Sequence, residues 1–144
     1  MYREKYDMWL ESPYVDDELK IELKKIQNDN SEIEDRFSKE LEFGTGGMRG
    51  KIGAGSNRMN LVTVAKATQG IADYLNESYS GELSVAIAYD SRNMSKEFAS
   101  KAACVFAANN IFVYLFESLR PTPELSFAVR HFKCKAGVVI TASP

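Results

Sequence analysis

The residues that most clearly could do chemistry lie at the end of the chain, where an apolar run ends in hydroxyl side chains. Residues 136–141 read as a short strand, and Ala142 and Ser143 follow Thr141 directly. Open α/β sheets place ligands and reacting groups at the carboxyl ends of their strands. We therefore take Ser143 as a candidate nucleophile, whose activating partners would lie in a part of the protein beyond this chain.

A second candidate stretch is glycine-rich and runs from Phe43 to Gly50. Its four glycines free the backbone to adopt left-handed angles and to approach a ligand closely. The Thr45 hydroxyl and the Arg49 guanidinium inside it suit an anion, above all a phosphate. The pattern is neither a Walker loop nor a good dinucleotide fingerprint. A glycine-rich turn carrying a solvated arginine is the alternative, and spacing alone leaves both open.

The elements that must position these residues follow a β-α-β-α-β pattern from residue 83 onward. Apolar runs predict three strands, and amphipathic segments between them predict two crossover helices (strands 83–89, 111–116 and 136–141; helices 95–108 and 122–132). A near-continuous apolar strand is typical of a sheet that is covered on both faces. The fold class predicted is α/β, a three-layer α/β/α arrangement around a mainly parallel, mixed sheet.

Parallel strands end at the same edge of a sheet, so the loops after the three strands should be neighbours. Those loops offer Asp90, Arg92, Arg120 and the hydroxyls before and at Ser143. Together they could form a cleft that faces an anion. Asp90 and Arg92 could equally pair with each other and brace their loop. The single histidine, His131, is interpreted as structural, because no serine-histidine triad can be assembled around it.

Residues 1–41 predict a helical arm of three helices that acts as scaffold. Asp16 is placed to cap the second helix, and Ser31 with Glu34 forms an S-x-x-E capping box ahead of the third. Asn60 is placed to cap a longer helix that follows the glycine-rich stretch. The domain division predicted is therefore 1–41 for the arm and 42–144 for an α/β/α domain.

Composition excludes several classes of protein. The formal net charge is −2 without a basic run, which argues against nucleic acid or an anionic membrane as the main partner. No apolar run approaches the length of a membrane span, and the N-terminus opens no secretory signal. Cys104 and Cys134 lack metal-ligand spacing and are expected to be buried thiols in a reducing compartment. The expected location is cytoplasmic.

Several motifs in order resemble those of the α-D-phosphohexomutases, the phosphoglucomutase and phosphomannomutase superfamily. The chain is most similar to the N-terminal domain I of the bacterial phosphoglucomutase branch. The resemblance covers essentially the whole chain, and its anchors are the Phe-Gly-Thr-Gly-Gly-Met-Arg-Gly stretch, Gly53 with Asn57 to Asn60, Ala88 to Arg92, Arg120 to Leu125 and Gly137 to Ser143.

The resemblance implies a phosphoserine mechanism with Ser143 as the phosphorylated residue and with Arg49 stabilising the phosphate. It implies conversion of hexose 1-phosphate, most readily glucose 1-phosphate, to hexose 6-phosphate through a hexose 1,6-bisphosphate. Mg²⁺ is the implied cofactor, bound in part by an oxygen of phosphorylated Ser143. The implied partners are a sugar phosphate and the remaining three domains of the same chain, which supply the other metal, sugar and phosphate ligands.

One departure from the family pattern occurs at the serine. The family reads Thr-Ala-Ser-His-Asn-Pro, whereas Pro144 follows Ser143 directly here. The chain is therefore expected to be a truncated part of the enzyme and to be inactive alone. The alternatives are a phosphomannomutase or phosphopentomutase of the same family, a sugar-phosphate-binding module without chemistry, and a docking domain.

Overall fold

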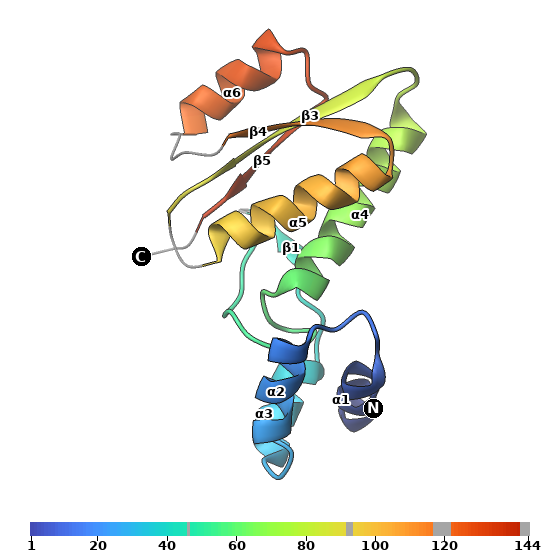
Figure 1. The fold of residues 1–144 in the computed structure, drawn as a ribbon, viewed down its shortest axis with the longest axis vertical. Coiled ribbons are helices and arrows are strands. Elements are labelled where there is room, and N and C mark those ends of the chain that lie inside the picture. The colour runs from blue at the N-terminus through green and yellow to red at the C-terminus, as the bar shows by residue number, and fades with distance from the viewer. Residues whose placement is uncertain (46, 92–93, 117–121, 142–144) are drawn as a thin grey trace. The chain divides into compact units, whose positions relative to one another are not determined.

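The computed structural model of the chain describes residues 1–144 apart from residues 46, 92–93, 117–121 and 142–144, and apart from the side chains of 122–124. It divides into two compact units, Met1–Thr63 and Val64–Pro144. Figure 1 shows the elements, which are α1 (Tyr2–Glu11), α2 (Asp17–Lys25), α3 (Asn30–Phe37), β1 (Phe43–Gly44), β2 (Gly47–Met48), α4 (Leu61–Ser78), β3 (Leu83–Tyr89), α5 (Ser95–Ala108), β4 (Ile111–Phe116), α6 (Thr122–His131) and β5 (Ala136–Ile140). Among the described residues, no helix is long and apolar enough to cross a bilayer.

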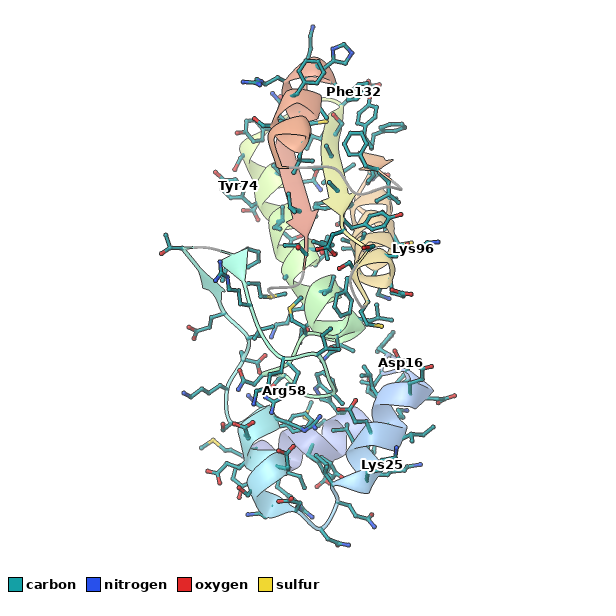
Figure 2. The ribbon with its side chains drawn as sticks, turned by 90° about the vertical axis from the view of Figure 1, so that its left-hand side faces the viewer. Asp16, Lys25, Arg58, Tyr74, Lys96 and Phe132 are labelled. Atoms are coloured by element: carbon teal, nitrogen blue, oxygen red, sulfur yellow. The ribbon has the colours of Figure 1, made fainter. Side chains whose placement is uncertain are left out.

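The three predicted helices of the arm are present, and aspartates begin two of them. The Asp16 carboxylate accepts a hydrogen bond from the Leu19 N–H at 2.9 Å, as predicted, and Figure 2 labels Asp16 and Lys25 at the two ends of α2. The capping box predicted for α3 is wrong. Asp29 caps this helix by accepting from the Glu32 N–H at 3.1 Å, so Ser31 lies inside the first turn. An ionised carboxylate at the start of a helix also interacts favourably with the helix dipole.

Aromatic side chains from α1 and α3 form the core of the arm. Tyr6 and Trp9 meet the Phe37 ring edge to face, with centroid distances of 5.9 and 5.5 Å. The Tyr6 hydroxyl donates to the Leu23 carbonyl at 2.8 Å, and burial raises the pKa of this phenol. Ala54, from the loop that follows β2, is fully buried in the same cluster. The arm and this loop therefore share one core.

Arg36 binds the loop to the arm through charged groups. Its guanidinium pairs with Glu22 and, at 2.8 Å, with Glu32, and it also donates to the Ala54 carbonyl at 3.0 Å. Glu22 in turn accepts from the Ala54 N–H at 3.2 Å. Gly55 (φ 135°) lies so close to Arg36 that a Cβ at this position would be 2.7 Å from the Arg36 carbonyl oxygen. The hydrogen bonds of Arg36 and Glu22 to Ala54 hold residues 53–55 against α2 and α3. The close contact between Gly55 and the Arg36 backbone has the same effect.

Arg58 makes a second link, where the loop meets the helices of the arm (Figure 2). Its side chain is buried, forms an ion pair with Asp35 and donates to the Asn57 carbonyl at 3.1 Å. The Asn57 amide donates to the Asp35 carbonyl at 3.0 Å. A buried guanidinium that lost its carboxylate would keep its desolvation cost without compensation.

Asn60 closes the loop and begins α4, as predicted. Its buried amide donates to the carbonyls of Gly53 and Gly55 at 2.8 and 3.0 Å. Its Oδ1 accepts from the Thr63 N–H, while the Thr63 hydroxyl accepts from the Asn60 N–H, each at 3.0 Å. This reciprocal capping satisfies two backbone donors at the start of the helix. The division predicted between an arm at 1–41 and a domain from residue 42 stays a prediction.

The second unit contains a parallel sheet of three described strands in the order β4-β3-β5. The central strand pairs from Leu83↔Ile111 to Ala88↔Phe116 on one side and from Val85↔Ala136 to Tyr89↔Ile140 on the other. β3 is buried almost throughout, which explains its near-continuous apolar sequence. The predicted α/β class is confirmed.

The two crossover helices cover opposite faces of this sheet (Figure 1). On one face, Leu125 and Val129 of α6 pack over Ala86 and Ala88 of β3. A Cβ added at Gly137 would be 2.8 Å from a Val129 methyl, so α6 approaches β5 closely. The other face is covered by α5. The small and aromatic side chains on the inner side of this helix are buried, and they are Phe98, Ala99, Ala102 and Phe106.

The prediction that both cysteines are buried is wrong. Cys104 is exposed on α5, Cys134 is half-buried, and neither forms a disulfide. Position 104 falls on the outer side of α5, where periodicity alone could not separate a thiol from the neighbouring alanines.

We predict that acid weakens the arm and loop through Asp35. The hydrogen bond and charge of Arg58 lower the pKa of this carboxyl. Since the pKa is lower in the folded than in the unfolded chain, the stabilisation is complete above the unfolded value of about 4 and is lost as the pH falls through the folded value. The urea midpoint of the wild type should therefore fall between about pH 5 and pH 3 more steeply than that of Asp35→Asn.

The matched control is Asp7→Asn, at an exposed position on α1. It should keep the acid-dependent loss of the wild type. Parallel pH profiles for the wild type and Asp35→Asn would contradict the assignment.

Candidate functional site

The glycine-rich stretch forms a small antiparallel hairpin. Phe43 pairs with Met48 and Gly44 with Gly47, so β1 and β2 run antiparallel. Gly47 has φ 96°, a left-handed angle that glycine adopts without steric cost. A Cβ at Gly50 would be 2.7 Å from a Leu41 methyl, which accounts for a further glycine immediately after the hairpin. The backbone angle explains Gly47, and close packing against Leu41 favours Gly50.

The two polar residues predicted to bind phosphate are exposed on this hairpin. Thr45 lies in its turn, and Arg49 follows β2 directly. Within the described part of the chain, neither the Thr45 hydroxyl nor the Arg49 guanidinium makes a hydrogen bond or an ion pair. In the same unit Arg36 and Arg58 are both paired with carboxylates. Arg49 thus keeps its five N–H donors for a ligand.

Loop 51–60 connects the hairpin to the arm. The Met59 N–H donates to the Lys51 carbonyl at 2.8 Å, and the Gly53 N–H donates to the Met59 carbonyl at 3.1 Å. The Leu41 N–H, before the hairpin, donates to the Ser56 carbonyl at 2.9 Å. Both ends of the hairpin are therefore fixed to a loop that the arm holds by ion pairs and by a shared core.

The carboxyl edge of the sheet brings together residues that are far apart in the sequence. Asp90 follows β3, and its carboxylate accepts from the Ser95 hydroxyl at 2.8 Å and from the Thr141 hydroxyl. The Asp90 N–H donates to the Ile140 carbonyl at 3.2 Å. The loops after β3 and β5 are therefore neighbours, as predicted.

Other residues predicted at this edge fall outside the described residues. They include the candidate nucleophile Ser143 as well as Arg92 and Arg120. The predicted roles of Ser143, Arg49 and Thr45 stay predictions. His131 contacts the rings of Phe127 and Phe132, with centroid distances of 5.5 and 5.0 Å.

Sequence reasoning missed two features of the site. The alternative that Asp90 braces its own loop did not include Thr141, which lies 51 positions later in the sequence. The arm was interpreted as scaffold alone, yet its Glu22, Asp35 and Arg36 hold the loop behind the hairpin. The excess of charged residues over apolar ones in α3 was a usable signal, since a short helix seldom buries an arginine without carboxylates nearby.

The carboxylates that the structure describes do not cluster in the way that metal ligands do. Among the described residues, no three His, Cys, Asp or Glu side chains lie close enough together to hold a metal ion. The residues described here therefore do not complete a Mg²⁺ site by themselves.

Comparison with known proteins identifies the family. The model of the phosphoglucomutase/phosphomannomutase α/β/α domain I matches residues 40–144. Phosphoglucomutase of Staphylococcus epidermidis is 46% identical over 114 residues, covering 79% of this chain and 21% of the relative. Phosphoglucomutase of Staphylococcus aureus is 42% identical over 139 residues, covering 95% of this chain and 24% of the relative. No solved structure matches the chain.

The match includes the hairpin, the β-α-β-α-β unit and the terminal serine segment, and the chain spans less than a quarter of the length of these relatives. The chain belongs to the phosphoglucomutase/phosphomannomutase family and carries its α/β/α domain I.

Proposed function

We propose that this chain is the first domain of a longer phosphohexomutase that interconverts hexose 1-phosphate and hexose 6-phosphate. Family membership supports the reaction class, and the names of the staphylococcal relatives favour glucose as the sugar. Because the chain spans 21% and 24% of those relatives, a longer protein has room for the three further domains that would complete the site.

In the proposed reaction, phosphorylated Ser143 donates its phosphoryl group to the free hydroxyl of a hexose monophosphate. The bond between phosphorus and the serine oxygen breaks and a bond to the sugar oxygen forms. The proton of the sugar hydroxyl is transferred to the serine oxygen. The resulting hexose 1,6-bisphosphate reorients and returns its other phosphoryl group to Ser143 by the reverse exchange. Positioning and charge neutralisation dominate such transfers.

The observation that carries the proposal is the exposed guanidinium of Arg49 on an anchored hairpin, where it pairs with none of the residues that the structure describes. Arginine binds phosphate oxygens through two parallel N–H donors, and its charge offsets that of the transferring group. The Thr45 hydroxyl is exposed on the same hairpin and can donate a further hydrogen bond. We assign phosphate stabilisation to Arg49 and phosphate binding to Thr45.

Mg²⁺ is the proposed cofactor, with one oxygen of phosphorylated Ser143 as a ligand. When bound, the ion would neutralise part of the phosphoryl charge. Since the described residues contain no cluster of metal ligands, the remaining ligands would come from the other domains. The proposed location is the cytoplasm, because Cys104 and Cys134 are both free thiols.

Replacing the nucleophile should abolish turnover. In the full-length enzyme, Ser143→Ala should lower kcat for glucose 1-phosphate to the background rate, because no other hydroxyl replaces the phosphoryl carrier. A coupled assay for hexose 6-phosphate measures this rate. Ser100→Ala, at an exposed position on α5, is the matched control and should keep wild-type kcat. Wild-type turnover by Ser143→Ala would refute the assignment.

Replacing the guanidinium by an ammonium should weaken catalysis without unfolding the domain. Arg49→Lys should lower kcat/KM by about 10- to 150-fold, since a hydrogen bond to a charged group contributes roughly 1.5–3 kcal/mol. The thermal midpoint should stay close to that of the wild type, because Arg49 is exposed. Arg130→Lys, at an exposed position on α6, is the control. Equal kcat/KM for Arg49→Lys and Arg130→Lys would exclude a role in phosphate binding.

The isolated chain of 144 residues should have no appreciable mutase activity, because the proposed sugar and metal ligands lie in other domains. Its turnover of glucose 1-phosphate should equal that of the same chain carrying Ser143→Ala. Activity clearly above this control would show that the described domain contains a complete site.

A further inference from the structure

We propose that Asp90 is a positioning residue for phosphoryl transfer, because it fixes Thr141, two residues before Ser143 in the sequence, to the sheet and to α5. The inference rests on the proposed function of Ser143. It assigns to Asp90 a role that acts through Thr141, without contact to the sugar or to the phosphoryl group.

The carboxylate of Asp90 joins three elements. One oxygen, Oδ1, accepts from the hydroxyl of Ser95 at the first turn of α5. The other, Oδ2, accepts from the hydroxyl of Thr141, the residue that follows β5. Ser95 is 2% exposed, so this partner is held inside the domain and cannot move with the loop.

These contacts extend the sheet beyond its backbone ladder. The last pair in register between the central strand and β5 is Tyr89↔Ile140, which makes Asp90 and Thr141 the next facing positions. The Asp90 N–H continues the backbone pairing by donating to the Ile140 carbonyl. Beyond this backbone bond, the ends of the two strands are connected by the hydrogen bond from the Thr141 hydroxyl to the Asp90 carboxylate.

A carboxylate suits this position better than its amide analogue. An ionised aspartate is an acceptor only, so both hydroxyls can donate to it, and such charge-assisted bonds are stronger than neutral ones. Its place before the N-terminus of α5 also favours the negative charge. An asparagine would offer one acceptor oxygen and an NH₂ group, so one of the two hydroxyls would have to reverse its role.

The link between Asp90 and Thr141 should restrict the position of the Ser143 side chain. Ser143 is two residues after Thr141, and two residues of extended chain span at most about 7 Å. An error of about 1 Å in a reacting group can cost about 100-fold in rate. Fixing Thr141 therefore limits where the serine oxygen can be when the phosphoryl group is transferred.

The test uses the full-length protein with glucose 1-phosphate as the probe. Thr141→Val and Asp90→Asn should each lower kcat about 10- to 100-fold while KM changes by less than about threefold, as expected when positioning is lost and ground-state binding is kept. Thr141→Ser keeps the hydroxyl and should retain kcat within about threefold. The double variant should be no slower than the slower single variant, because both changes remove the same link.

Thr68→Val is the matched control, since the hydroxyl of Thr68 donates to the Val64 carbonyl within α4. It should leave kcat unchanged. Thr141 is exposed, so its variants should fold even if a change at Asp90 lowers stability. With an active wild type, normal kcat in Thr141→Val or purely additive losses in the double variant would overturn the positioning role.

A second measurement separates this proposal from the proposed function. Amide hydrogen exchange of residues 139–143 should be faster in Thr141→Val and Asp90→Asn than in the wild type or Thr141→Ser. An inactive wild type would refute the proposed function, and the exchange rates would then decide the role of Asp90 alone. Exchange rates equal to those of the wild type in both Thr141→Val and Asp90→Asn would overturn the positioning role of Asp90.

Discussion

The parallel pairing of β3 with β5 is the constraint on which the candidate site depends. Their register ends at Tyr89↔Ile140, and this places Asp90 beside Thr141 although 51 positions separate them. The pairing is stable because helices cover both faces, so β3 is apolar almost throughout and buried. Burial of the central strand and the position of Thr141 beside Asp90 therefore have the same cause.

The hairpin that carries Arg49 depends on a different set of forces. Arg36 and Arg58 are paired with carboxylates of the arm, and the buried Asn60 amide holds the carbonyls of Gly53 and Gly55. These contacts fix the loop, while the Arg49 guanidinium makes no ion pair with any described residue. A fixed backbone carrying an available cation is the arrangement that phosphate stabilisation requires, since little reorganisation remains when the charge develops.

Local sequence predicted the elements well where one physical signal dominated. The apolar run at 83–89 predicted β3, and Asp16 and Asn60 predicted helix starts because each side chain can accept a backbone N–H. The start of α3 was misplaced because Asp29 competes with Ser31 for the same role and a charged acceptor is stronger.

Contacts between distant segments were harder to predict. The parallel-sheet argument predicted that the loops after β3 and β5 meet, but it could not choose Thr141 as the partner of Asp90. That choice depends on the register of the strands, and a shift of one residue would turn the side chain to the other face. The binding of loop 51–60 by the arm likewise depends on tertiary packing around Ala54 and leaves no periodic signal in the sequence.

The central claim is that Ser143 carries the phosphoryl group. The most direct test is mass-spectrometric mapping of phosphorylation in the full-length protein after incubation with glucose 1,6-bisphosphate. We expect a single phosphoryl group on the peptide that contains Ser143, and we expect it to be lost when glucose 1-phosphate is added in excess as the acceptor. A phosphoryl group on another residue, or none on the Ser143 peptide, would contradict it.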